Sequence, residues 1–510
     1  MTKADFSIHN TRDIKSYKKI RSTDDLIVYF VMLIFSISTG EVSPSDLVKT
    51  AGSTGKYGFY SAMMMIVYNL GIKWQYGLSK SCEIVASMNV KSNEFRNFLL
   101  RTSQVFQLGD DLKAFFKGEL YSIMQSFSAA YDRSMESMKL MLGMYSTLIS
   151  TSAFLIAAVM ILAMLSGDSQ SQEFAIVSMI SVVIGLAMFV IIMYRIFPAD
   201  PLMPTKKDKG ESDKKWNIDH LAKFRMWLYI TLALSIVLSL SLPFLDILPV
   251  ELVIAISGIP LSIPGYIAHK LASRIQKLEN VYPSFVKHFG DIYATVGSLG
   301  QSLSAVLRSD LGELDAHVRA MHNRIINRVS MEDSFELLSQ ETGSRIISSG
   351  NTIISNALAK GADMSTVGSV LADITSKFLE MRRKRKQSAA AFHSTILILH
   401  VLTLAVFGLM NKLIEFFSLI FAQLQGEMSI ILVQPIDPAL MSTAVPAMIL
   451  VLAGVNAMSI KISQGGLQQT VWLDVAILIV IGGVVVYGVD LFLSQMFDDL
   501  LENEILQTVG

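Results

Sequence analysis

Seven long apolar stretches, separated by segments rich in lysine and arginine, constrain the fold of this 510-residue chain more than any other feature. A helix that crosses the hydrocarbon core of a bilayer needs about 20 apolar residues. Stretches of that length occupy residues 140–165, 174–194, 226–245, 247–268, 392–410, 439–460 and 475–497. They predict an all-α, polytopic membrane protein with about seven transmembrane helices.

The composition supports a location in lipid for these stretches. Hydrophobic residues make up 52% of the chain and charged residues only 17%, whereas soluble globular chains are typically about 25% charged. A single soluble core stops growing near about 250–300 residues, so it could not hide this many apolar side chains. The formal net charge is zero, which gives no electrostatic argument for a nucleic-acid partner.

A shorter apolar run at residues 26–39 (LIVYFVMLIFSIST) is an eighth candidate for a transmembrane helix. Its length of about 14 residues is more typical of a buried core helix than of a helix that crosses a bilayer. We therefore expect this run to lie inside a soluble domain.

Lysine and arginine predict the orientation in the membrane, because cytosolic loops retain them. Of the 43 such residues, 17 lie in residues 1–139, 8 in 195–225 and 16 in 270–386, and the other two are Lys412 and Lys461. With seven spans, all three rich segments are cytosolic if the N-terminus is cytosolic and the C-terminus external. Lys412 is then the one misfit, at the outer end of the fifth span, where it can snorkel to the interface.

The predicted organisation alternates soluble and membrane parts. It comprises a cytosolic helical domain at 1–139, four transmembrane helices at 140–268 with a basic cytosolic linker at 195–225, a second cytosolic helical domain at 269–391, three transmembrane helices at 392–497 and an external acidic tail at 498–510. Apolar residues recur at helical spacing in both cytosolic segments. Within the linker, residues 198–215 are rich in proline and charge, which predicts a flexible connection.

The two cytosolic segments resemble each other. Residues 77–109 align without gaps onto residues 329–361, at a constant offset of 252. Each repeat ends in a charged helix that runs into an apolar span. An internal repeat of this kind predicts two copies of one supersecondary unit.

Four glycines mark the predicted turns of the repeats. Gly40 and Gly300 follow the first helix of each repeat, and Gly109 and Gly361 follow a later amphipathic helix. A left-handed backbone position at the end of a helix is the ordinary reason for such glycines. We assign them a structural role.

The sequence offers no candidate for catalysis, for a cofactor or for a metal ion. Cys82 is the single cysteine, which excludes a disulfide within the chain and a cysteine-rich zinc site. Residues 51–59 (AGSTGKYGF) superficially resemble a phosphate-binding loop. However, two residues separate Gly52 from Gly55 and a tyrosine follows Lys56, whereas that loop needs four residues and then Ser or Thr. We expect a protein that is not an enzyme.

Two histidines lie within the fifth predicted span. His393 and His400 are seven residues apart and therefore share one face of that helix. A hydrogen bond or helix packing inside the bundle is the expected role. A proton or substrate pathway is the alternative.

Two basic groups are candidates for docking a partner. Arg319, Arg324 and Arg328 are predicted to lie on an exposed helix face. The second group immediately precedes the fifth span and consists of Arg382, Arg383, Lys384, Arg385 and Lys386. That run can act as a positive-inside anchor, bind anionic lipid, or attract a cytosolic partner electrostatically.

Residues 282–307 (YPSFVKHFGDIYATVGSLGQSLSAVL) and the helix–glycine–helix at 360–382 resemble the type II secretion F-domain family. That family includes the inner-membrane platforms of type II secretion, type IV pili and the archaellum. Bacterial pilus platforms of the family have three spans. Four predicted spans between the repeats and three after the second are instead similar to the archaeal members.

The resemblance implies a platform in an archaeal cell membrane. A hexameric secretion ATPase would dock on the cytosolic domains, and its cycle would lift filament subunits, archaellins or pilins, out of the bilayer. In an archaellum the same ATPase would also drive rotation. A homodimer is expected as well, and the filament could be an archaellum or an adhesive pilus.

Two other function classes remain open on the residues alone. A secondary transporter often has broken helices near the bilayer midplane, and the fourth span contains Gly258, Pro260, Pro264 and Gly265. A membrane-bound sensor or enzyme is the other class, although no catalytic constellation supports it.

Overall fold

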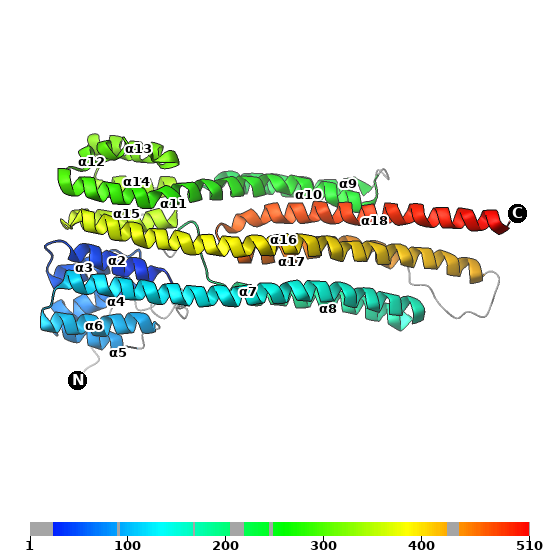
Figure 1. Ribbon diagram of the computed structural model, residues 1–510, viewed down its shortest axis with the longest axis horizontal. Helices are drawn as coiled ribbons and strands as arrows, with labels where there is room; N and C mark the ends of the chain where they lie inside the picture. The colour runs from blue at the N-terminus through cyan, green and yellow to red at the C-terminus, as the bar shows by residue number, and fades with distance from the viewer. Residues whose placement is uncertain are drawn as a thin grey trace. The chain divides into compact units, whose positions relative to one another are not determined.

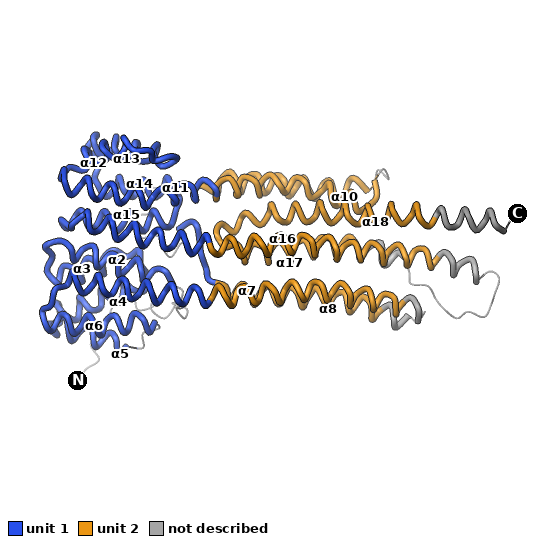
Figure 2. Tube along the Cα trace, in the orientation of Figure 1, with its two compact units in different colours: residues 1–133, 198–219, 273–383 blue, residues 134–197, 220–272, 384–510 orange. Residues whose placement is uncertain are grey.

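The computed structural model describes residues 24–88, 92–166, 169–204, 219–243, 248–425 and 438–508. Every regular element in these residues is helical (Figure 1). The chain divides into two compact units (Figure 2). Unit 1 comprises Met1–Arg133, Pro198–Asp219 and Ser273–Arg383, and unit 2 comprises Ser134–Phe197, His220–Ala272 and Lys384–Gly510. The chain is an all-α, polytopic membrane protein, as the sequence predicts.

Unit 1 contains both sequence repeats. The first repeat consists of α2 (Leu26–Ser38), α3 (Pro44–Ser53), α4 (Phe59–Tyr68), the π-helical η1 (Asn69–Lys73), α5 (Leu78–Ser87), α6 (Asn93–Leu108) and the first part of α7 (Leu112–Ser166). The second consists of the last part of α11 (Ser262–Val296), α12 (Leu299–Val306), the 3-10 helix η5 (Gly312–Leu314), α13 (Asp315–Ile326), α14 (Met331–Thr342), α15 (Arg345–Ala359) and the first part of α16 (Met364–Gln425).

The repeat is visible in the ends of the helices. Ser92 caps the N-terminus of α6, and Ser344, 252 residues later, caps α15 in the same way. Gly109 and Gly361 both have left-handed backbone angles, with φ of +73° and +64°. The long helices α7 and α16 each begin three residues after these glycines. A side-chain cap and a left-handed glycine are local signals, so the two repeats fold by the same local rules.

The other two predicted turn glycines have different roles. Gly300 lies inside α12, and the left-handed residue of that turn is Gly297, at φ +69°. The assignment of the turn to Gly300 is therefore wrong by three residues. Gly40 has no positive φ. A Cβ there would come within 2.5 Å of the carbonyl oxygen of Lys360, so Gly40 permits close approach between the repeats.

Helix α2 forms the centre of unit 1. All eleven of its residues from Ile27 to Ile37 are buried by protein. Tyr29 stacks on Phe378 with ring centroids 5.0 Å apart, and Phe30 packs against Tyr60. Each fully buried large apolar side chain contributes about 1.5–3 kcal/mol of transfer free energy. The short apolar run is a core helix in this unit, as its length predicts.

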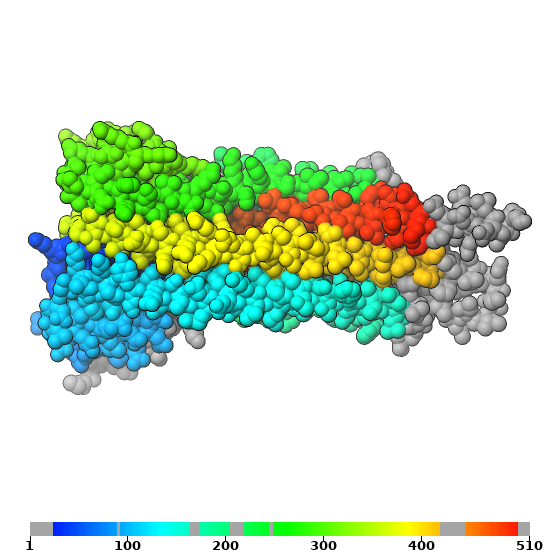
Figure 3. All heavy atoms as spheres, in the orientation of Figure 1, coloured from blue at the N-terminus to red at the C-terminus, as the bar shows by residue number. Residues whose placement is uncertain are grey.

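The two segments predicted as separate cytosolic domains pack together. Helix α2 of the first repeat lies against α15 of the second. Ion pairs join Lys56 to Glu336 at 2.7 Å and Lys113 to Asp363 at 3.3 Å. Phe127 of α7 packs edge-on against Phe378 of α16, and these two long helices lie next to each other in the space-filling view (Figure 3).

Asp24, just before α2, gives unit 1 a predicted dependence on pH. Burial, assisted by the charge of Asp25, raises the pKa of Asp24 from 3.8 to about 6. A carboxyl whose pKa is raised on folding stabilises the fold when protonated, and this contribution is lost as the pH rises from about 4 through about 6. We expect Asp24→Asn to unfold at a higher temperature than wild type at about pH 7 and to show a flatter pH profile.

The measurement is thermal unfolding of the detergent-solubilised chain across this pH range. Asp132→Asn, at an exposed carboxyl of α7, is the control and should keep the wild-type profile. An Asp24→Asn profile that matches wild type would contradict the prediction.

Unit 2 contains the membrane-spanning helices. They are the remainder of α7, α8 (Ser169–Ile196), α9 (Ala222–Ser241), α10 (Val250–Gly258) continued through the 3-10 helix η4 (Ile259–Leu261) into α11, the remainder of α16, α17 (Pro438–Gln464) and α18 (Val471–Thr508), which the 3-10 helix η6 (Gln468–Thr470) precedes. Among the described residues, seven helices are long and apolar enough to cross a membrane.

Glycines bring α18 against the fourth span. A Cβ at Gly265 would overlap the backbone of Leu473, and a Cβ at Gly483 would overlap the carbonyl of Glu251. A Cβ at Gly258 would lie 2.7 Å from the side chain of Ile479. Small residues at helix interfaces are a usual way to pack membrane helices. The glycines of the interrupted fourth span therefore have a packing role.

Candidate docking surface and buried charge clusters

The three arginines predicted to share an exposed face do not do so. Arg319 is exposed and pairs with Asp315 within α13, at 3.0 Å. Arg324 turns toward α14, where it pairs with Glu341. Arg328 lies beyond the end of α13, in a left-handed conformation with φ +61°. The prediction of one common face is wrong because the register of α13 and its end separate the three side chains.

Glu341 is held as a carboxylate by its neighbours. Burial by itself raises the pKa of Glu341, but His317 and Arg324 outweigh burial and leave this pKa below its ordinary value. Arg324 therefore belongs to a partly buried pair that joins α13 to α14. Removal of one partner from such a pair is costly because it leaves the other charge unpaired.

Arg382, the first residue of the basic run, is the centre of a buried ion cluster in unit 1. Its guanidinium makes a bidentate pair with Asp200, at 2.9 and 2.7 Å, and a third bond with Glu279. Glu279 is fully buried and also accepts a hydrogen bond of 2.6 Å from the hydroxyl of Ser344. The cluster ties α11, α15 and α16 to the segment that follows α8. Arg382 therefore has a structural role inside unit 1.

The start of the predicted flexible linker is ordered. Asp200 pairs with Arg382, and Leu202 is buried, with its carbonyl accepting a 3.0 Å hydrogen bond from the backbone nitrogen of Arg345. Arg345 in turn makes a bidentate pair with Asp25, at 2.6 and 2.9 Å. The prediction of a flexible connection is therefore wrong for residues 198–204. Residues 205–218 lie outside the described residues.

Arg385 is buried in unit 2 and caps a helix. Its Nε donates to the carbonyl of Ser463 at 3.0 Å and its Nη2 to that of Ile462 at 2.8 Å. These carbonyls belong to the last turn of α17, where a cation is favourable. Only 2% of Arg385 is exposed, so it cannot serve as a landing site. The exposed members of the run are Arg383, Lys384 and Lys386.

A polar network inside unit 2 accounts for one of the two histidines. The imidazole Nε2 of His400 lies 3.1 Å from the carbonyl of Leu478, and its Nδ1 lies 3.1 Å from the amide nitrogen of Asn456. The amide oxygen of Asn456 accepts from the hydroxyl of Tyr145 at 2.9 Å. One assignment satisfies every contact, with Nε2 donating and Nδ1 accepting. The network joins α7, α16, α17 and α18, as expected for a hydrogen-bonded helix bundle.

A second polar group lies near the turn between α17 and α18. Lys461 donates to Thr470 at 2.7 Å, and His393 Nε2 lies 3.7 Å from Asp474. Lys461 and Asp474 are both buried. Reasoning from the sequence missed both contacts. His393 and Asp474 lie on helices far apart in the chain, and Lys461 meets Thr470 through the turn between α17 and α18.

The structure gives no support to a nucleotide site at residues 51–59. Gly52 lies within α3 against Met65, and Lys56 is paired with Glu336. In the part of the chain that the structure describes, no three side chains of His, Cys, Asp or Glu are grouped to hold a metal ion. The charged and polar contacts described above join helices to one another.

Comparisons with known proteins give the chain its relatives. It is 27% identical over 341 residues to Flagella accessory protein J of Methanococcus voltae, which covers 64% of this chain and 58% of that protein. It is 24% identical over 486 residues to Flagella accessory protein J of Methanocaldococcus jannaschii, which covers 92% of this chain and 84% of that protein. The chain is similar to archaeal flagella accessory protein J.

The similarity to accessory protein J of M. jannaschii extends over parts of both units, because it covers 92% of the chain. The match to accessory protein J of M. voltae spans 58% of that relative, which is less than two thirds of its length. No protein-family model and no solved structure matches the chain.

Proposed function

We propose that this chain is the membrane platform of an archaellum-assembly machine. Unit 1 docks a hexameric secretion ATPase, and the ATPase cycle is coupled through unit 2 to the insertion of filament subunits into a growing filament. The observation that carries the proposal is the similarity to accessory protein J along 92% of the chain. Among the described residues, a large helical unit and seven helices apolar enough to cross a membrane fit a platform better than a transporter or an enzyme.

The two longest helices supply a physical route for the coupling. Helix α7 has 55 residues and α16 has 62, and each runs without interruption from unit 1 into an apolar span. They occupy equivalent positions in the two repeats. An uninterrupted helix is stiff, since each turn is hydrogen-bonded to the next. A displacement at the N-terminal end of α7 or α16 is therefore passed along the helix.

Further parts of the proposal follow from the resemblance of the repeats. Each repeat is a type II secretion F domain, the chain acts as a homodimer, and it catalyses no reaction itself. The N-terminus is cytosolic and the C-terminus external, because the three segments rich in Lys and Arg then lie in the cytosol. An adhesive pilus platform is a second candidate that shares this plan, but the names of the relatives favour the archaellum.

Cysteine labelling in whole cells tests the orientation. Cys82 is buried, and burial raises the pKa of its thiol to about 12, so it should be replaced by alanine without loss of a reactive group. An impermeant maleimide is then expected to label Asn503→Cys and to leave Lys209→Cys unlabelled. Labelling of Lys209→Cys in intact cells would contradict the proposed topology.

ATPase binding tests the platform function. The full-length chain is placed in lipid nanodiscs and sedimented with the hexameric secretion ATPase of the same cell. We expect saturable retention of the ATPase by chain-containing nanodiscs and none by empty nanodiscs. If the nanodiscs retain no ATPase, with either ATP or ADP present, the proposed docking is overturned.

A further inference from the structure

In both repeats an exposed turn precedes an equivalent helix, which is α5 in the first repeat and α14 in the second. We name residues 72–77 elbow 1 and residues 326–329 elbow 2. Elbow 1 overlaps the end of the π-helix η1 and holds Gln75 at φ +58°, and elbow 2 holds Arg328 at φ +61°. Within the described ranges, these are the two non-glycine residues with positive φ. Strain of this kind and π-helical turns recur at functional sites.

Both elbows lie at the same end of unit 1. At that end, Gly40 approaches the carbonyl of Lys360 closely, and helices α7 and α16 begin. Elbow 1 borders a cavity that Pro44 and Gln107 also line, and both of these residues lie near that end. Beside elbow 2, Ile325 contacts the position of Gly300, at the start of α12.

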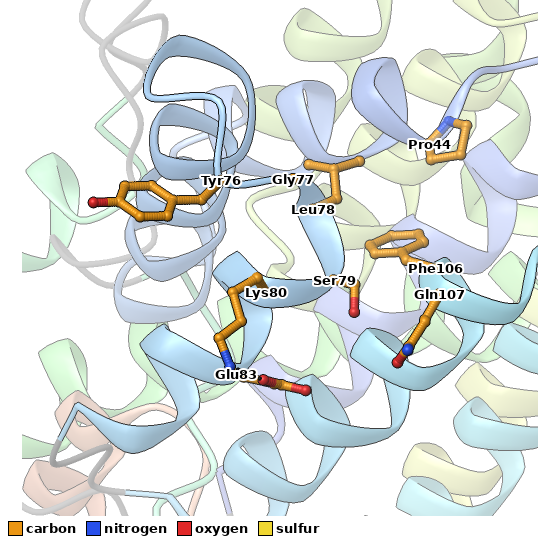
Figure 4. A pocket seen from close by; sticks show the side chains of 9 residues that line it. All are labelled: Pro44, Tyr76, Gly77, Leu78, Ser79, Lys80, Glu83, Phe106 and Gln107. Atoms are coloured by element: carbon orange, nitrogen blue, oxygen red, sulfur yellow. Dashed lines mark hydrogen bonds and ion pairs between the residues drawn. The ribbon is translucent and has the colours of Figure 1, made fainter.

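Elbow 1 presents aromatic side chains beside a cavity. Trp74 and Tyr76 are each 54% exposed. The cavity has a volume of about 640 Å³. Figure 4 shows Leu78 and Phe106 on the cavity wall near Pro44, while the Tyr76 ring points away from them. The cavity lining also includes the polar side chains of Ser79, Lys80 and Glu83. Exposed aromatic groups beside a concave surface with apolar and polar groups are typical of protein–protein hot spots.

Elbow 2 also presents exposed apolar side chains, which are aliphatic and not aromatic. Ile326 is 61% exposed, and Val329 is also exposed. Each elbow carries a cation, Lys73 in the first and Arg328 in the second, that forms no ion pair with the described residues. An unpaired cation beside exposed apolar groups complements a partner surface that is acidic and apolar.

We propose that the two elbows are twin docking points for the hexameric secretion ATPase, each binding the same acidic and apolar surface of a different ATPase subunit. This inference rests on the proposed function. It adds where the chain contacts the ATPase and that each chain has two such contact sites. A ring of identical subunits offers the same surface repeatedly, and the internal repeat of unit 1 offers the complementary surface twice. Two linked contacts make the second binding event intramolecular, which raises the overall affinity beyond that of either contact.

Charge reversal at the elbows tests the inference. Wild-type chain, Lys73→Glu, Arg328→Glu and the double variant are immobilised in nanodiscs, and binding of the hexameric ATPase is measured by interferometry. We expect each single variant to bind about 3–10-fold more weakly and the double variant at least about 30-fold more weakly. Arg96→Glu and Lys287→Glu reverse exposed cations elsewhere on unit 1 and should leave the affinity near that of wild type.

A second variant separates docking from misfolding and from a general charge effect. Trp74→Ser keeps the charge of elbow 1, and it should weaken binding about as much as Lys73→Glu does. Equal losses in the Arg96 and Lys287 controls would overturn the inference, as would a double variant no weaker than either single variant. If wild-type chain does not bind the ATPase, the proposed function fails. If wild type binds and the elbow variants bind equally well, only the elbow inference fails.

Discussion

Replacing Ala129 of α7 by proline is expected to abolish filament assembly while the chain stays in the membrane and still binds the ATPase. Ala129 is exposed and lies in the part of α7 that belongs to unit 1. Proline removes one backbone hydrogen bond and clashes with the preceding turn, at a cost of about 3 kcal/mol or more, and it kinks the helix. A kinked α7 absorbs a displacement that a straight helix would transmit.

Two companion variants make this experiment specific. Ala129→Ser keeps the helical hydrogen bond and should assemble filaments as wild type does. Ser376→Pro places the same lesion at an exposed position of α16, the equivalent helix of the second repeat, and should also stop assembly. Filaments are counted by electron microscopy in cells whose membrane levels of the chain are matched. Wild-type filament numbers in the Ala129→Pro strain would refute transmission through α7.

Replacing Gly265 by valine is expected to prevent the fourth span from packing on α18. A Cβ at this position would overlap the backbone of Leu473, and backbone cannot move aside as the end of a flexible side chain can. Overpacking usually costs about 1–3 kcal/mol and more where the backbone must shift. We expect loss of about 3 kcal/mol or more of stability, together with low membrane levels of the chain.

Gly454→Val supplies the matched control for this substitution. A Cβ at Gly454, in α17, would meet no atom within 4 Å. Valine also has a somewhat better helix propensity than glycine, so this variant should be as stable as wild type. Thermal unfolding of the two variants in detergent, followed by size-exclusion chromatography, measures the difference. Equal unfolding temperatures for Gly265→Val and Gly454→Val would show that the close packing of α18 is unimportant.

The sequence predicts the membrane helices well because span length and apolar content are local properties. The short run at 26–39 is correctly placed in a core for the same reason: about 14 residues cannot cross a bilayer. The repeat is also readable, since Gly109 and Gly361 need left-handed backbone and keep the offset of 252. Gly300 is misassigned because a second glycine, Gly297, lies three residues before it.

The basic run shows why the roles of its residues could not be predicted from their charge alone. Five consecutive cations look alike in sequence, yet Arg382 and Arg385 are internal. A signal was present: Arg385 continues the helical spacing of buried Ala389 and Phe392. The hydrogen-bond partners of Arg382 and Arg385 could not be predicted. Asp200 and Ser463 are more than 70 residues from these arginines in sequence, and only the packed fold brings them together.

Deletion of the gene for this chain, followed by electron microscopy of the cells, tests the platform function most directly. We expect cells without archaella, in which archaellins and the secretion ATPase are still produced. The wild-type gene supplied in trans should restore the filaments. The Ala129→Pro gene should restore the membrane protein and no filaments. Wild-type numbers of archaella on cells that lack the gene would contradict the platform function.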